Sequence, residues 1–270
     1  TTTPTSTTTP TSTPTSTPTS TPSRTFDTVE AAFDAVLQDK PLVLAVGETH
    51  AQKDVAPNVP STTKRFTDSF LPKLKGRATD LVLELWVANG SCGKQEKQVA
   101  QQQKDVTATQ AQANQNEFVA LGDAAKKLGV APHVLIPPCD EYAKILDAGA
   151  GDVDAMLSMI ARLTARDLSA WLGKHEGGDA MIVAYGGAMH NDLYPRKGRE
   201  AWSYGPEVSA KAKGRYVELD LIVPEYVKDT DAWRAQPWYA SYDAAKQGQR
   251  AVLFEVGRGA YALIFPRAAP

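Results

Sequence analysis

The sequence predicts an α/β protein with a mostly parallel central sheet flanked by helices. Short apolar runs alternate with amphipathic helical segments along most of the chain, which is typical of parallel βαβ units. Near the end, two apolar runs flank Gly257-Arg258-Gly259, a hairpin signal that predicts an antiparallel ending to the sheet. A polar helical insertion is expected at about 94–128.

The first half of the chain alternates between helix and strand. A helix is predicted over residues 28–38, and the apolar run 42–46 follows it as the first strand. Ser61 can cap a second helix, which Gly76 ends, and residues 80–85 form the next strand. Because helices separate the strands, we expect right-handed crossovers and parallel pairing.

The Gln- and Lys-rich start of the insertion predicts either one long exposed helix or a helical pair that projects from the sheet. Periodicity predicts the remaining elements. The expected strands are 130–136, 181–185, 216–223, 251–256 and 260–265, and the expected helices are 140–148, 152–173 and 229–247.

The first 23 residues contain only Thr, Ser and Pro. Such a segment cannot bury enough apolar surface to offset the entropy of ordering it. We therefore expect a disordered linker over 1–23, either O-glycosylated or a plain spacer, ahead of a single α/β domain over 24–270.

The charge and the apolar content of the chain limit the kinds of partner that we expect. The net charge is −2 and no basic stripe is visible, so nucleic acid is not expected as a partner. No apolar run approaches the roughly 18 residues that span a bilayer. The Thr/Ser/Pro segment at a non-Met start fits an exported protein of the bacterial periplasm or cell surface. Contact with a membrane is expected only through a lipid anchor that this sequence does not contain.

The two cysteines, Cys92 and Cys139, each follow a predicted strand by a short segment. In a parallel sheet both then lie at the same edge, so a disulfide between them is expected in an exported protein. It would close a loop of nearly 50 residues, worth about 4 kcal/mol in the loop-entropy description. Two buried free thiols are the alternative.

Three predicted strands end in polar clusters that can do chemistry. The first runs into Glu48 and His50, the second into Glu84, and a later one into His190. Both histidines end a Gly-x-x-His sequence, where glycine allows a sharp turn and close approach of a ligand. Parallel strands would bring all three clusters to the edge where ligands bind in open α/β sheets.

Two histidines and two glutamates make a mixed nitrogen and oxygen ligand set for a divalent metal ion of unspecified identity. Glu48, His50, Glu84 and His190 are therefore predicted as catalytic and metal-binding residues. Without a metal, a His–Glu pair can still activate water, and the residues alone leave both possibilities open.

The other two histidines lack this setting. His133 lies within a strand-like run and His175 near a polar helix end, so both are interpreted as structural or surface residues. The sequence contains no HExxH, GxxxxGK[ST] or GxSxG motif. The common zinc-protease, P-loop and α/β-hydrolase signatures are therefore absent.

Three segments resemble a known superfamily, namely LVLAVGETH (42–50), DLVLELW (80–86) and MIVAYGGAMHNDLYP (181–195). They look like the superfamily that groups TIKI proteases, TraB/PrgY, erythromycin esterases and ChaN haem-uptake lipoproteins, and most like its ChaN-like members. The resemblance implies that Glu48, His50, Glu84 and His190 form the site. The chain departs from the ChaN pattern at Ala51, where Asp is common, and in its polar segment 94–117.

The resemblance implies two functions. TIKI-like members are implied to be metal-dependent peptide hydrolases, so we expect a hydrolase that acts on a small-molecule or peptide substrate. ChaN-like members are implied to bind haem as lipoproteins, so the alternative is a haem- or iron-binding uptake protein without turnover. In that case Tyr185, Tyr194 or Tyr204, near His190, would supply an oxygen ligand. A third reading is an interaction module that uses the polar segment as its contact face.

Overall fold

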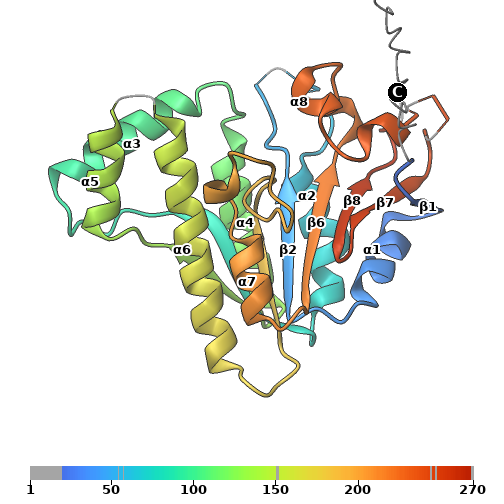
Figure 1. Ribbon diagram of the computed structural model, residues 1–270, viewed down its shortest axis with the longest axis horizontal. Coiled ribbons are helices and arrows are strands. Elements are labelled where there is room, and N and C mark those ends of the chain that lie inside the picture. Colours follow the sequence, from blue (N-terminus) through green and yellow to red (C-terminus); the bar gives the residue numbers. More distant parts are fainter. Residues whose placement is uncertain are drawn as a thin grey trace, which may run out of the picture.

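A computed structural model describes residues 20–53, 55–56, 58–149, 152–243, 245–246 and 248–268. Most of the linker predicted over 1–23 lies outside these residues. Figure 1 shows helices on both faces of one twisted sheet. Within the described residues the sheet has eight strands in the order β1-β7-β8-β6-β2-β5-β3-β4.

The sheet is mostly parallel, as predicted. All pairs from β8 across to β4 run parallel, whereas β7 pairs antiparallel with both β8 and β1. The hairpin prediction is therefore confirmed. The strands are β1 Ser23–Phe26, β2 Val43–Glu48, β3 Ala78–Trp86, β4 Ala131–Leu135, β5 Met181–Gly187, β6 Tyr216–Ile222, β7 Ala251–Gly257 and β8 Ala260–Ile264.

One face of the sheet packs against the N-terminal helices and α4, which lie behind the sheet in Figure 1. Successive side chains of β2 point to opposite faces of the sheet, and Leu44 and Val46 point into this core. Phe33 and Phe70 stack there with ring centroids 4.4 Å apart. The elements of this layer are α1 Val29–Leu37, α2 Thr62–Arg65, the π-helical turn η1 Phe66–Phe70, η2 Leu71–Leu74 and α4 Ala113–Lys127.

The opposite face packs mainly against the long helix α6, with Val43 and Ala45 of β2 pointing into this second core. The elements on this side are α3 Lys94–Val106, α5 Cys139–Ala148, α6 Val153–Lys174 and α7 Gly205–Lys211. The polar insertion forms two helices and not one long helix, but it does not project from the sheet as a pair, because α4 packs against β3 and β4 while α3 lies against α5.

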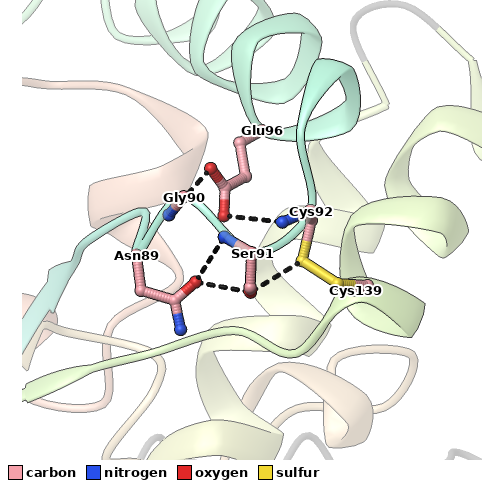
Figure 2. Close-up of a disulfide and its surroundings, with 6 residues drawn as sticks. All are labelled: Asn89, Gly90, Ser91, Cys92, Glu96 and Cys139. Carbon is pink, nitrogen blue, oxygen red and sulfur yellow. Dashed lines mark hydrogen bonds between the residues drawn. A yellow bond between two sulfur atoms is a disulfide. The ribbon is translucent and has the colours of Figure 1, made fainter.

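A disulfide joins Cys92, before α3, to Cys139 at the start of α5, as Figure 2 shows. The same figure shows how the preceding loop is held. The buried Glu96 carboxylate accepts hydrogen bonds from the backbone N–H groups of Gly90 and Cys92, at 3.2 and 3.3 Å. The disulfide and this carboxylate together anchor α3 to the body of the protein.

The prediction of a helix over 229–247 is wrong. The described residues of this range form only short helical pieces, because aromatic side chains hold the chain against β7 and β8. Trp238 is 1% exposed and packs on Phe254 with ring centroids 6.2 Å apart. The remaining short elements of the structure are η3 Glu200–Trp202, η4 Pro224–Tyr226, α8 Asp231–Arg234 and η5 Tyr239–Ser241. Among the described helices, none has the length and apolar character that crossing a membrane requires.

Candidate functional site

The four residues predicted for the site converge at the carboxyl ends of three neighbouring strands. Glu48 ends β2 and pairs in register with Gly187, which ends β5 three residues before His190. Glu84 comes from β3, on the other side of β5. All four, including His50, line one cavity of about 1130 Å³. The topology therefore places them together, as the pattern of strand ends predicted.

Two glycines of β5 make this convergence possible. A Cβ atom at Gly186 would overlap the Glu84 carboxylate. One at Gly187 would lie 3.1 Å from Nε2 of His50 and 3.4 Å from Oε2 of Glu84. The absence of a side chain at both positions therefore lets a histidine from one strand end and a glutamate from another approach the same backbone.

Glu48 holds His50 in place. Nδ1–H of His50 donates to Oε1 of Glu48 at 2.8 Å. The other carboxylate oxygen, Oε2, accepts from the hydroxyls of Tyr185 at 2.5 Å and Thr63 at 2.7 Å. Glu48 is 4% exposed and both of its oxygens are engaged. Its role in this arrangement is to position His50 and leave Nε2 of that ring facing Gly187.

The same contacts change the acidity of His50. Burial opposes the charged form, but the hydrogen bond to Glu48 and the negative charges of Glu48 and Glu84 outweigh it and raise the pKa of His50 to about 9. The metal-free protein therefore carries an imidazolium at this position at neutral pH. Such a group donates protons and does not accept them.

His190 is oriented in a similar way by a backbone carbonyl. Its Nδ1–H donates to the carbonyl oxygen of Trp202 at 2.7 Å. The opposite ring atom, Nε2, lies 3.7 Å from Oε1 of Glu84. Oε2 of Glu84 accepts from the backbone N–H of Gly187 at 2.5 Å. Met189, just before His190, has a φ of 95°, a strained value for a residue with a side chain, so the loop is held in an unfavourable backbone conformation.

These contacts fit the donor set of a metal site in chemical terms. Metal-ligating histidines usually donate their second ring N–H to a carboxylate or a carbonyl, as both histidines do here. Nε2 of His50, Nε2 of His190 and the Glu84 carboxylate then remain as possible ligands. In this metal-free arrangement their ligand atoms do not all lie within 4.8 Å of one another.

In the described part of the chain, a different group of side chains has its ligand atoms within this distance of one another. The sequence did not lead us to predict it. Asp192, Glu218 and Asp220 bring their carboxylate oxygens within 4.8 Å of one another. Burial, and then the charge of Asp192, raise the pKa of Asp220 to about 7, and burial with the charge of Asp220 raises the pKa of Glu218 well above its usual value. The spacing of Glu218 and Asp220 could have indicated it, because acidic residues two apart in an apolar strand lie on the same face.

The cavity has two walls of different character. The α3–α4 pair and its connecting turn contribute carboxamide side chains, and the first half of α6 contributes apolar ones. The carboxamides are Gln103, Gln110, Gln112, Asn114 and Gln115, and the apolar side chains are Val153, Met156, Leu157 and Ile160. The cavity can therefore contact a ligand that has both neutral polar and apolar parts.

The segment after His50 joins this wall to the site. Gln52 forms an isolated antiparallel bridge with Gln110, and the backbone N–H of Ala111 donates to the carbonyl of Ala51 at 2.8 Å. The polar insertion is therefore fastened directly to the loop that carries a site histidine.

The other predicted residues lie elsewhere. His133 and His175 each contact Asp80 at 2.8 Å, near the start of β3 and far along that strand from Glu84, which agrees with their structural interpretation. None of the three tyrosines considered as haem ligands lines the large cavity. The hydroxyl of Tyr185 donates to Glu48 and that of Tyr194 to the carbonyl of Arg258.

Fold and site together define an α/β protein with a Glu/His cluster inside a large cavity at the carboxyl edge of its sheet. No protein-family model matches the chain, and no curated protein matches it. Among solved structures it is similar to one titled "The structure of the type III effector HopBA1". The identity is 12% and the TM-score 0.42, over 87% of this chain and 92% of that one. A likeness this distant carries no argument about function.

Proposed function

We propose that this protein is a metal-dependent hydrolase of the ChaN/TIKI-like class, whose site is built on His50, Glu84 and His190. The observation that carries the proposal is the orientation of the two imidazoles. Each has its Nδ1–H engaged by an acceptor, which leaves Nε2 available beside the Glu84 carboxylate. Two imidazole nitrogens and one carboxylate are a donor set of hydrolytic zinc sites.

Each residue then has a distinct role. His50, His190 and Glu84 would hold the metal ion, and Glu48 positions His50 without binding the metal itself. A divalent metal bound there would lower the pKa of a water molecule and polarise the carbonyl of a substrate. The backbone N–H of Gly187 restrains Glu84 from the opposite side.

The negative charges of Glu48 and Glu84 beside His50 are compatible with a bound cation. With a pKa of about 9, His50 already carries its proton at neutral pH and does not act as a general base there. Replacing that proton by a metal ion would relieve the same negative surroundings of Glu48 and Glu84, so metal binding is expected to release a proton.

The substrate class follows from the cavity. A volume of about 1130 Å³ with one carboxamide wall and one apolar wall suits a peptide or a small molecule with mixed surface. Action outside the cytoplasm, at a tether or lipid anchor, remains part of the proposal. The Cys92–Cys139 disulfide is compatible with that setting.

Metal analysis of the purified protein tests the proposal, together with hydrolysis of chromogenic ester and peptide substrates. His50→Ala and His190→Ala should lose both the metal and the hydrolysis. His175→Ala is the matched control, because it removes an imidazole outside the cavity. A protein without bound metal whose properties do not change in either site variant would contradict the proposal.

Haem binding is the second candidate, because the cavity is large, has an apolar wall and contains two histidine Nε2 atoms. The tyrosines do not support it, since none lines that cavity. A haem titration followed by absorbance separates the two candidates. A Soret shift that saturates near one equivalent and is lost in His190→Ala would favour haem over hydrolysis.

A further inference from the structure

The acidic residues Asp192, Glu218 and Asp220 form a cluster beside the hydrolytic site proposed above, and Asp220 also lines the large cavity. Glu218 and Asp220 lie two residues apart on β6 and so share a face, and Asp192 comes from the loop that follows β5. Their ligand oxygens all lie within 4.8 Å of one another. Arg196 and Arg199 line the same small cavity and act electrostatically on Asp192, but no lysine or arginine of the described chain forms an ion pair with any of the three.

The hydrogen bonds of the cluster leave oxygens free. One oxygen of Glu218 accepts from the backbone N–H of Leu193, and Oδ1 of Asp220 accepts from Nδ2 of Asn191 at 2.9 Å. The second oxygen of each carboxylate, and both oxygens of Asp192, have no side-chain or backbone hydrogen bond in the described residues. Carboxylates gathered in this way repel one another unless a positive charge or protons lie between them.

Two buried polar atoms beside the cluster point independently to a missing ligand. Trp238 lines a second cavity of about 100 Å³ together with all three acids, and its indole N–H has no acceptor among the described residues. Oδ1 of Asn191, which is 1% exposed, also has no partner in the described part of the chain. A buried polar group without a partner is costly.

Gly47 leaves room for this arrangement because it has no side chain. A Cβ atom at Gly47 would lie 2.6 Å from Oδ1 of Asn191 and would overlap Oδ1 of Asp220. The unpartnered amide oxygen and a carboxylate oxygen of the cluster therefore meet over the same glycine. A cavity of about 100 Å³ has space for an ion and a few water molecules, one of which could accept from the indole N–H.

We propose that Asp192, Glu218 and Asp220 bind a hard divalent cation, Ca²⁺ or Mg²⁺, at a second site that lies beside the Glu/His site and uses different ligands. The donors are oxygens alone, which these cations prefer, whereas the Glu/His site offers nitrogen. The cation would join β6 to the loop that carries both Asp192 and His190, and so fix that loop.

Calorimetric titration of the chelator-treated full chain with CaCl₂ and with MgCl₂ tests the proposal. One equivalent of one cation should bind, and the binding should persist in His50→Ala. Glu218→Gln and Asp220→Asn should weaken it by at least about tenfold, because each removes a charged ligand but keeps an oxygen acceptor. Glu255→Gln, on the exposed side of β7, is the matched control and should bind like the wild type.

Terbium luminescence locates the site even where an acidic variant fails to fold. Trp238 lines the small cavity, so it should sensitise emission from bound Tb³⁺, and Trp238→Phe should lower the emission while calorimetric binding persists. The proposal is overturned if neither cation binds the wild type, if Glu218→Gln and Asp220→Asn fold and bind equally well, or if the emission is unchanged in Trp238→Phe. Binding that disappears in His50→Ala would assign the cation to the Glu/His site instead and would also overturn it.

Discussion

At the scale of single residues, Glu48 and Glu84 show how neighbouring carboxylates receive different tasks. Glu48 is enclosed by three donors, from His50, Thr63 and Tyr185, and faces the interior of the site. Glu84 accepts from one backbone N–H and keeps an oxygen near His190. The first carboxylate therefore has both oxygens engaged around a ring, whereas the second keeps one oxygen without a hydrogen bond in the described residues, as the proposed metal site requires.

Replacing Glu48 by Gln in the metal-free protein should lower the pKa of His50 from about 9 toward 6.5, because the negative partner is lost. The folded pKa of His50 lies above its unfolded value. The pair therefore stabilises the fold fully below pH 6.5, and this stabilisation is lost as the pH rises through about 9. NMR titration of His50 measures the first effect. Unfolding of both proteins from pH 6 to 10 measures the second, and an unchanged His50 pKa in Glu48→Gln would refute the assignment.

Gly186→Ala should displace the Glu84 carboxylate, because the added Cβ would occupy its place. We expect a loss of about 1–3 kcal/mol in the free energy of unfolding, with weaker metal binding. Gly173→Ala in α6 is the control. It meets nothing within 4 Å and should stabilise the helix by up to about 1 kcal/mol. Equal stability of the two variants by urea unfolding would show that the site does not depend on close approach at β5.

At the scale of elements, the polar α3–α4 pair forms a wall of the large cavity. Three connections hold it: the disulfide to α5, the Glu96 carboxylate under the loop before α3, and the bridge from Gln52 to Gln110. Of its apolar residues α3 buries Val99, whereas α4 packs Phe118, Leu121 and Ala125 into the core. The position of α3 therefore depends mainly on these connections, and that of α4 also on buried apolar surface.

Removing the disulfide with Cys92→Ser and Cys139→Ser together should cost about 4 kcal/mol, since the bond closes a loop with a sequence separation of 47. Urea unfolding of the wild type, with and without reductant, should show the same loss. Because α3 contacts α5, hydrogen exchange should also rise in α3 before it rises in β2 or β5. A double variant as stable as the oxidised wild type would contradict this account.

At the scale of the whole molecule, most of the fold could be predicted from hydrophobic periodicity and turn signals. The strands β2 to β8 lie within a few residues of the predicted runs, and Ser61 caps the second helix as expected. The edge strand β1 was missed, because it is short, mostly exposed and preceded by Thr, Ser and Pro. Its hydrogen bonds depend on β7, more than 220 residues away, which no local pattern shows.

Part of the candidate site could also be predicted from the sequence, and part of it could not. Glu48, His50, Glu84 and His190 could be predicted because each lies at or just beyond an apolar strand. The separate roles of the two glutamates could not, since they depend on Thr63 and Tyr185 reaching Glu48 from other elements. The acidic cluster depends on the loop after β5 turning Asp192 back toward β6, which is a tertiary effect.

A second cluster near the start of β3 should contribute to stability alone. Asp80 is buried, and although burial opposes its charged form, hydrogen bonds from Thr79, His133 and His175 lower its pKa. Asp80→Asn should cost about 1–3 kcal/mol at pH 7. Because the folded pKa is depressed, this stabilisation exists above the unfolded value of 3.8 and is lost as the pH falls through the folded pKa.

Acid unfolding of Asp80→Asn beside the wild type measures this difference, which should shrink below about pH 4. Asp179→Asn is the control, because that carboxylate pairs with Arg215 in an exposed setting and should matter little. A difference that stays constant from pH 7 to pH 2 would show that Asp80 acts by packing and not by charge.

The central claim is that His50 and His190 present their Nε2 atoms, with Glu84, to one metal ion. Titration of the metal-free protein with Co²⁺, followed by its visible absorption, tests this most directly, because nitrogen ligation changes the spectrum of the ion. We predict saturation near one equivalent in the wild type and in His175→Ala, and a loss of the signal in His50→Ala and in His190→Ala. An absent signal in the wild type, or one that is the same in all four proteins, would contradict the claim.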